Sequence, residues 1–138
     1  MRPLSQYLLA AVVGFGMTRD EALPVDFAAL SDFEFVQGMK LPEHVTKLHK
    51  KKVKLTGFMM RDGGGSGPVD YFLLVSDQCG CQGMPFLNEV VFCDLEPGKS
   101  IELLPGLVTV EGTIFVGEVV EDGVTTSLYN LDVDKVGP

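Results

Sequence analysis

Positive charge is scarce in this chain of 138 residues. Its 11 lysines and arginines are outnumbered by 19 aspartates and glutamates, which gives a formal net charge of -8 at pH 7. A field of this sign repels phosphate backbones, so binding to nucleic acid or to an anionic membrane lacks its main electrostatic driving force. We therefore expect no nucleic-acid partner, and the partners to be considered are proteins, small molecules or cations.

Long apolar runs and catalytic motifs are also missing. After its first residues the chain has no stretch near the roughly 20 apolar residues that a membrane-spanning helix needs. Its two histidines, His44 and His49, accompany no serine or cysteine nucleophile at a motif position. The glycine run at 63–65 lacks the following lysine of a phosphate-binding loop. The sequence predicts a protein that is not an enzyme.

The first sixteen residues have the pattern of an export signal. Arg2 precedes a largely apolar stretch from Leu4 to Val13, and the glycines at 14 and 16 offer a cleavage site. We expect a signal peptide over 1–16 and an exported protein of the periplasm or cell envelope, without a transmembrane segment in the mature chain. A buried amphipathic helix would read similarly and stays open as the alternative.

The remaining chain is long enough for one core and too short for two ordinary domains. We divide it into an N-terminal extension over 17–40 and a barrel domain over 41–138. The aromatics within Val25–Phe35 indicate a segment that docks against the body. Pro42–Leu48 predicts a short helix with Leu41, Val45 and Leu48 on one face and both histidines directed to solvent.

Strand patterns dominate from Lys52 onward. The alternation and the turn residues between the runs predict a mainly β fold with little helix, and Asp122-Gly123 is the best hairpin signal. Glycines within the first and fourth runs would permit sharp coiling, which favours a small five-stranded OB-like antiparallel barrel over an open sandwich. The five predicted strands are Val53–Met60, Val69–Ser76, Glu89–Leu95, Leu107–Gly117 and Leu128–Val136.

Two of the three cysteines lie in one turn, Cys79-Gly80-Cys81-Gln82-Gly83-Met84-Pro85. Three interpretations remain open. One cysteine could form a structural disulfide in an oxidising compartment. Cys79 and Cys81, with Cys93, could bind copper(I) or zinc as a carrier or sensor, although the spacing is unlike that of common zinc sites. A strained disulfide could serve thiol exchange. Cys93 shares a strand face with Val91 and Leu95, which favours a core residue.

The same turn is the candidate binding loop. We expect an envelope protein or a small ligand to contact the barrel face and this loop. No cofactor is firmly predicted, and copper and zinc are the candidates. Met59 and Met60 could add an adaptable apolar surface, or could simply fill the core. The predicted binding residues are Cys79, Gly80, Cys81, Gly83, Met84, Pro85 and Phe86.

Several blocks together resemble a family of known proteins: Lys51–Met59, Tyr71–Val75, the cysteine turn, Asn88–Phe92 and Val108–Thr113. The chain resembles, over roughly Val25 to Val136, a domain-of-unknown-function family of small exported bacterial proteins. The resemblance implies an OB-like barrel and an envelope location, and it supplies no activity. Members more often have adjacent cysteines, or a cysteine and a histidine, in the turn, whereas Gly80 separates the cysteines here.

Overall fold

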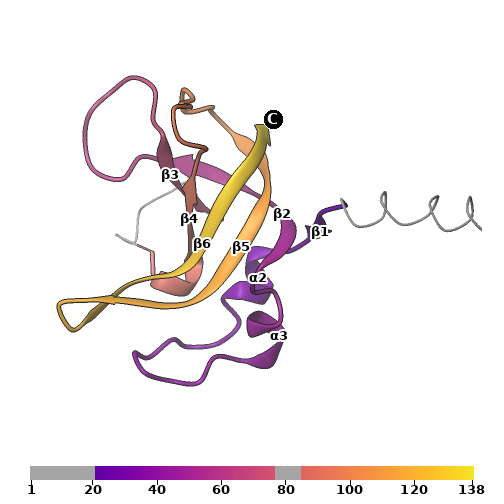
Figure 1. Cartoon of the computed structure of the whole chain (residues 1–138), viewed down its shortest axis with the longest axis vertical. Helices are drawn as coiled ribbons and strands as arrows, with labels where there is room; N and C mark the ends of the chain where they lie inside the picture. The colour runs from indigo at the N-terminus through magenta and orange to yellow at the C-terminus, as the bar shows by residue number, and fades with distance from the viewer. Residues whose placement is uncertain (1–20, 77–84) are drawn as a thin grey trace, which may run out of the picture.

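The computed structural model describes residues 21–76 and 85–138 (Figure 1). The predicted signal peptide and most of the cysteine turn lie outside these residues. Within them, no helix has the length and apolarity that crossing a bilayer requires. The elements are β1 (Leu23–Pro24), α2 (Phe27–Leu30), α3 (Glu43–Thr46), β2 (Lys51–Met60), β3 (Tyr71–Val75), η1 (Leu87–Glu89), β4 (Val90–Asp94), β5 (Leu107–Glu121) and β6 (Val124–Gly137).

The five long strands close into a ring. Their order is β2–β3–β4–β6–β5, and β5 pairs back onto β2. This arrangement confirms the predicted OB-like barrel, and the open sandwich is not formed. The sheet is mixed rather than wholly antiparallel, because β4 pairs with β6 in parallel and the short β1 pairs with β2 in parallel. The β4–β6 pair joins strands that lie on either side of β5 in the sequence.

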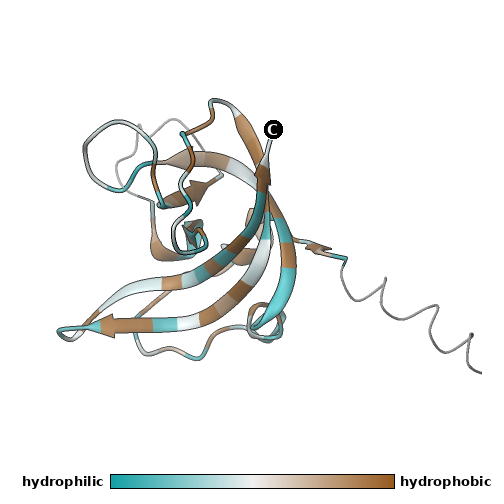
Figure 2. Ribbon diagram, turned by 45° about the horizontal axis from the view of Figure 1, so that its top comes forward, coloured by the Kyte–Doolittle hydropathy of each residue, from teal (hydrophilic) through white to brown (hydrophobic). Residues whose placement is uncertain are grey.

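Alternate residues of each strand fill the interior of the barrel. Val53 and Leu55 of β2 and Phe72 and Leu74 of β3 are fully buried there, together with inward residues of the other three strands. Figure 2 shows apolar and polar residues alternating along β5 and β6. The predicted period-two pattern is therefore confirmed, and the burial of its apolar half supplies the main driving force for folding.

Two glycines allow the strands to coil as predicted. A Cβ atom on Gly112 of β5 would collide with the backbone carbonyl of Asp132 on β6, and a Cβ on Gly57 of β2 would lie 2.6 Å from the carbonyl oxygen of Val75. A side chain at either position would push neighbouring strands apart. The close approach of backbones explains why glycine occupies both sites.

The segment before β2 closes one end of the barrel. Phe27 and Leu30 of α2 and Val45 of α3 belong to the same buried cluster as the strands, which confirms that the aromatic segment docks on the body. The Tyr129 hydroxyl donates a hydrogen bond to the Leu30 carbonyl at 2.7 Å, and both residues are fully buried. We call residues 25–35 the plug, since the barrel core is incomplete without them.

The predicted helix is shorter than expected but buries the predicted face. It spans only Glu43–Thr46, with Val45 and the following Leu48 buried. His44 of the helix and His49 after it are exposed, as expected, yet both are hydrogen-bonded. His44 Nε2 lies 3.0 Å from the Ala29 carbonyl oxygen, and His49 Nδ1 accepts the Val116 N–H at 3.0 Å.

The last two strands extend beyond the ring as a hairpin (Figure 1). The predicted strands end at Gly117 and begin again at Leu128, whereas β5 and β6 continue to a turn at Asp122-Gly123. Both turn residues have positive φ, 53° and 80°, as a type I′ turn requires, so the predicted hairpin is confirmed. We call residues 117–127 the arm. Irregular register between Val116 and Val120 marks the point where it leaves the barrel.

Candidate functional site

A second hydrophobic cluster lies on the outside of the barrel. Neighbouring residues on a strand point to opposite faces of the sheet. Since Phe72 and Leu74 point into the barrel, the residues next to them in β3 point outward. Outward Leu73 and Val75 of β3 and Val90 of β4 are nevertheless only 3–4% exposed. Side chains at solvent-facing positions are therefore packed almost as tightly as the core.

Neighbouring strands surround these three residues with further apolar side chains. Phe58 of β2 is the register partner of Val75, and Leu73 is paired with Phe92 of β4. The Tyr71 and Phe92 rings are stacked, with centroids 6.3 Å apart and an interplanar angle of 19°. Four members keep partial exposure at the rim. The residues of this apolar outer face are Phe58, Met60, Tyr71, Leu73, Val75, Val90 and Phe92.

Carboxylates border the apolar outer face at the far end of β3 and β4. The Tyr71 hydroxyl donates to Asp62 Oδ2 at 3.1 Å, and burial together with this carboxylate raises the pKa of the tyrosine. Burial, and then the nearby charges of Asp132 and Asp70, raise the pKa of Asp94. The border is thus acidic in character, which disfavours an anionic ligand.

An open polar pocket of about 660 Å³ adjoins this border. It lies between the glycine loop after β2 and the turn around Lys99, and Tyr71 contributes to its wall. Arg61 donates to the Gly67 carbonyl at 2.7 Å, and Lys99 pairs with Glu96, so both cations have partners within the loops. The pocket offers hydrogen-bond donors and hydrogen-bond acceptors beside the aromatic ring of Tyr71.

The predicted cysteine loop is attached to the other end of the apolar outer face. Cys79, Gly80, Cys81, Gly83 and Met84 lie outside the described residues. β3 ends at Val75 and β4 begins at Val90, and these two residues are register partners. The chain therefore leaves the apolar outer face and rejoins it at the same end. Of the predicted loop, Pro85 and Phe86 are described, and Phe86 is 74% exposed.

Cys93 lies in the barrel core, as the strand pattern predicted. It is fully buried, and its Sγ lies 3.6 Å from the Val91 carbonyl oxygen. Burial, with a smaller effect of the Asp94 charge, raises the pKa of the thiol. Within residues 21–76 and 85–138, no three histidine, cysteine or acidic side chains gather as a metal site would require. Coordination by Cys79 and Cys81 stays a prediction.

The methionines proposed as a contact surface are divided between two environments. Met59 packs against the barrel core, where its sulfur lies 3.4 Å from the Leu104 amide nitrogen. Met60 belongs to the apolar outer face. Sequence reasoning missed this face as a unit, although the signal was present, because Tyr71–Val75 is continuously apolar instead of alternating. A strand of this kind is buried on both sides.

Comparison with known proteins agrees with this architecture. A crystal structure of a DUF3299 family protein from Pseudomonas aeruginosa PAO1 matches 86% of this chain and 96% of its own, with a TM-score of 0.60 and 21% identity. At this identity the likeness shows the fold alone. The S. pombe Stn1-ten1 complex matches 85% of this chain and 75% of its own at 15% identity, but its TM-score of 0.38 supports no functional inference. No curated protein matches the chain.

The family itself is defined by a sequence model. The model described as protein of unknown function (DUF3299) matches residues 19–138, which include every described element. This match confirms the resemblance to a domain-of-unknown-function family, and the chain belongs to the DUF3299 family.

Proposed function

We propose that this protein is a non-enzymatic binding domain, exported to the cell envelope, that contacts an envelope protein or a small ligand through the apolar outer face and the cysteine turn. The observation that carries the proposal is the second hydrophobic cluster. The inward residues already form the core of the barrel. The barrel therefore does not need an apolar outer face in order to close. Its rim residues Phe58, Met60, Tyr71 and Phe92 are partly exposed. Contiguous exposed apolar surface commonly marks an interaction site.

The position of the face supports the same conclusion. OB-folds that bind extended ligands use the outer surface of their second and third strands with adjacent loops. Those strands are β3 and β4 here. The rim residues Phe58, Tyr71 and Phe92 keep partial exposure, and Phe86, which follows the cysteine turn in the sequence, is 74% exposed. Stacked aromatics can contribute to affinity beyond the area that they bury.

The charges around the face favour a particular chemistry. Asp62 and Asp94 lie beside Tyr71 through a hydrogen bond and a register pair, respectively. Acidic groups next to an apolar surface fit a neutral or cationic ligand, and an apolar peptide segment with a basic residue satisfies both features. Phosphate-bearing partners are disfavoured by the net charge of -8.

A photo-crosslinking experiment in native cells tests the proposal. A photoreactive phenylalanine analogue is placed at Phe86 or Phe92 in the full chain with its own leader, and a control copy has the analogue at Thr113 on the opposite outer surface. We expect both test positions to give the same adduct and Thr113 to give none. Equal labelling from Thr113, or no adduct from either test position, would remove the apolar outer face as the binding surface.

The native mass of the exported protein tests the remaining expectations. Removal of residues 1–16 would support export by the predicted signal, and the full-length mass in the cytosolic fraction would refute it. An added copper or zinc mass, lost when the thiols are alkylated, would favour the carrier or sensor alternative with Cys79 and Cys81 as ligands. A mass two protons lighter than the reduced chain would favour a disulfide at the turn.

A further inference from the structure

The arm is a two-stranded ribbon with two outer edges, one on β5 and one on β6. Another part of the described chain forms hydrogen bonds with the backbone of the β6 edge, but none pairs with the β5 edge. On its way to the arm, the outer edge of β5 pairs with β2 as far as Ile114. Lys50 then donates its N–H to the Ile114 carbonyl, and the His49 ring accepts the Val116 N–H. Beyond Val116, no strand among the described residues pairs with this edge of β5.

The β6 edge of the arm is bridged by a side chain. Gln37 Nε2 donates to the Gly123 carbonyl at 3.0 Å, and Gln37 Oε1 accepts the Thr125 N–H at 3.0 Å. A carbonyl and an N–H two residues apart are the groups that a neighbouring strand would use. The amide of Gln37 thus stands in for a strand on β6, whereas β5 has no equivalent in the part of the chain that the structure describes.

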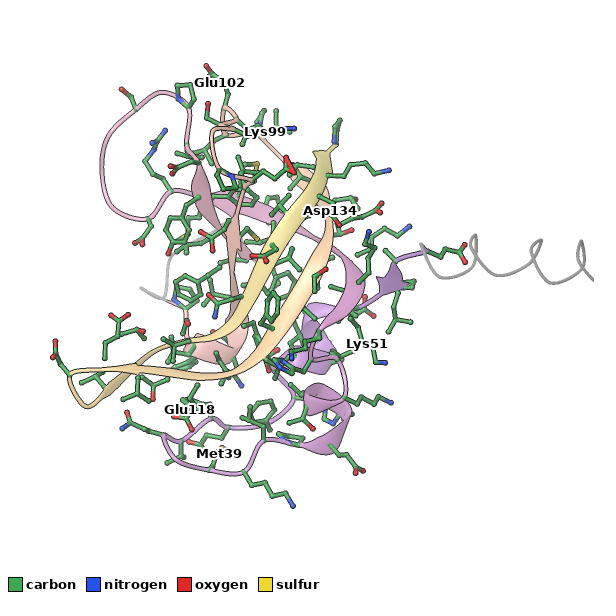
Figure 3. All side chains as sticks on the ribbon, in the orientation of Figure 1. Met39, Lys51, Lys99, Glu102, Glu118 and Asp134 are labelled. Carbon is green, nitrogen blue, oxygen red and sulfur yellow. The ribbon has the colours of Figure 1, made fainter. Side chains whose placement is uncertain are left out.

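A groove runs beside the unpaired edge. It has a volume of about 740 Å³ and lies between Val116–Glu118 of β5 and the segment from Met39 to Glu43 that leads into α3. Figure 3 shows Glu118 on the arm facing the loop that carries Met39 and leads to α3. The Glu118 carboxylate is already engaged by the Gly38 N–H at 2.9 Å and the Thr125 hydroxyl at 2.8 Å. Gly117 adds no side chain to fill the groove.

The surface around the edge is apolar and mainly acidic: Lys40 is the one cation among the residues that line the groove, beside Glu43 and Glu118. Exposed valines in the arm and the adjoining loop are 40–61% accessible: Val36, Val119, Val120 and Val124. Glu118, Glu121 and Asp122 are the charged residues of 117–127, which contains no lysine or arginine. Exposed strand edges pair readily with other chains unless they are blocked, and charge decides which chain is accepted.

We propose that the β5 edge of the arm is a docking site for an extended segment of a partner protein, which adds to the edge as a strand. Main-chain hydrogen bonds would supply the affinity, and the valines and acidic groups would select a segment of β-branched and basic residues. A second copy of this chain is the less suitable occupant, because pairing two arms would bring their acidic groups together. The inference is independent of the apolar outer face.

Amide exchange measured by NMR tests the proposal on the full chain. The probe is a short synthetic peptide that alternates valine and lysine, and the control is the same peptide with N-methylated backbone amides. We expect the first peptide to slow exchange of amides within 117–121 and the second to leave them unchanged. Protection by both peptides, or protection confined to β2–β4, would overturn strand addition at the arm.

A charge reversal tests the selectivity. The E121K variant should bind the valine–lysine peptide several-fold more weakly than the parent protein, while the control E102K, which makes the same change at an exposed position far from the arm, should not. Equal weakening by both variants would reduce the effect to net charge and refute the site. Protection of 117–121 by a dimer in the absence of peptide would overturn the proposal by assigning the edge to a second copy.

Discussion

The outer surface of this barrel is divided into two unlike faces that share β2. The first half of β2, with β5 and β6, forms a charged outer face in which Lys54, Glu111 and Lys135 are register partners. The second half of β2, with β3 and β4, forms the apolar outer face around Leu73. Both faces back onto the same core, with the same alternation of inward residues. The residues of the charged outer face are Lys52, Lys54, Thr109, Glu111, Thr113, Asp134 and Lys135.

The comparison separates what the fold requires from what it permits. The charged outer face shows that an OB-like barrel of this sequence closes with lysine, glutamate and threonine pointing outward. The apolar outer face therefore reflects a requirement other than closure of the ring, and binding is the requirement that we propose. If the two faces differ in this way, they should respond differently to substitution.

The largest effect is expected where backbones approach most closely. Replacing Gly112 by alanine places a methyl group against the backbone carbonyl of Asp132, which cannot rotate away. We expect Gly112→Ala to lose at least about 3 kcal/mol of unfolding free energy, enough to leave little folded protein. Gly57→Ala, at the start of the apolar half, should behave similarly. Urea unfolding and soluble yield measure both variants, and wild-type stability in either would contradict the close strand spacing at that glycine.

The second prediction compares the two outer faces directly. Leu73→Ala removes a side chain that is packed although it points outward, and should cost about 2–3 kcal/mol. Thr113→Ala on the charged outer face should change the unfolding free energy by less than about 0.5 kcal/mol. The measurement is chemical denaturation of both variants. Equal, small changes would mean that the apolar outer face is not a packed cluster.

A smaller effect is expected where the two faces meet, at the Asp94–Asp132 register pair. Burial and neighbouring acidic groups raise the pKa of Asp94 in the folded protein. A raised folded-state pKa gives stability below the unfolded-state pKa, and this stability is lost as the pH rises through the folded-state value. Asp94→Asn should therefore be more stable than the parent at pH 7.

The pH dependence distinguishes this effect from a change in packing. The gain from Asp94→Asn should shrink as the pH falls toward the ordinary aspartate pKa of 3.8, because the native carboxyl is then protonated. Unfolding curves across the acid range supply the measurement, and Glu102→Gln at an exposed position is the control. A gain that does not change with pH would point to packing instead of charge.

The smallest effect belongs to the charged outer face. Lys52 Nζ lies 3.2 Å from Asp134 Oδ2, and both side chains are well exposed. Exposed pairs of this kind contribute at most about 1 kcal/mol and are screened by salt. A double-mutant cycle of Lys52→Gln and Asp134→Asn should give a coupling below that value, falling further at high salt. A larger coupling would show that this face is stabilised by its charges.

Local patterns predicted most of the barrel because its inward residues alternate. The predicted strand Val53–Met60 differs from β2 only at its start, and Glu89–Leu95 exceeds β4 by one residue at each end. Gly57 and Gly112, which interrupt alternating runs, lie where the backbones of neighbouring strands approach closely. The strand positions depend on residues that are close together in the sequence, so local patterns are enough to predict them.

Features that depend on distant parts of the chain were not predicted. The parallel pairing of β4 with β6 and the strand β1 follow from how the ring closes, and no local pattern records them. The predicted strands stop short of the arm because Gly117 and Glu118 interrupt the alternation of β5. At the candidate site, Phe86 was predicted as a binding residue of the loop and is 74% exposed, and its binding role stays a prediction. The burial of the outward Leu73 could not be predicted, because it depends on the strands on both sides of β3.

The hydrogen bond from Tyr129 to Leu30 joins residues 99 positions apart. On the ribosome, the plug is therefore synthesised long before the strand that holds it in place. Fragments that stop before β6 leave Phe27 and Leu30 without their complete enclosure, and such long-range contacts form late and slowly. We therefore expect the core to be completed only when β6 is available.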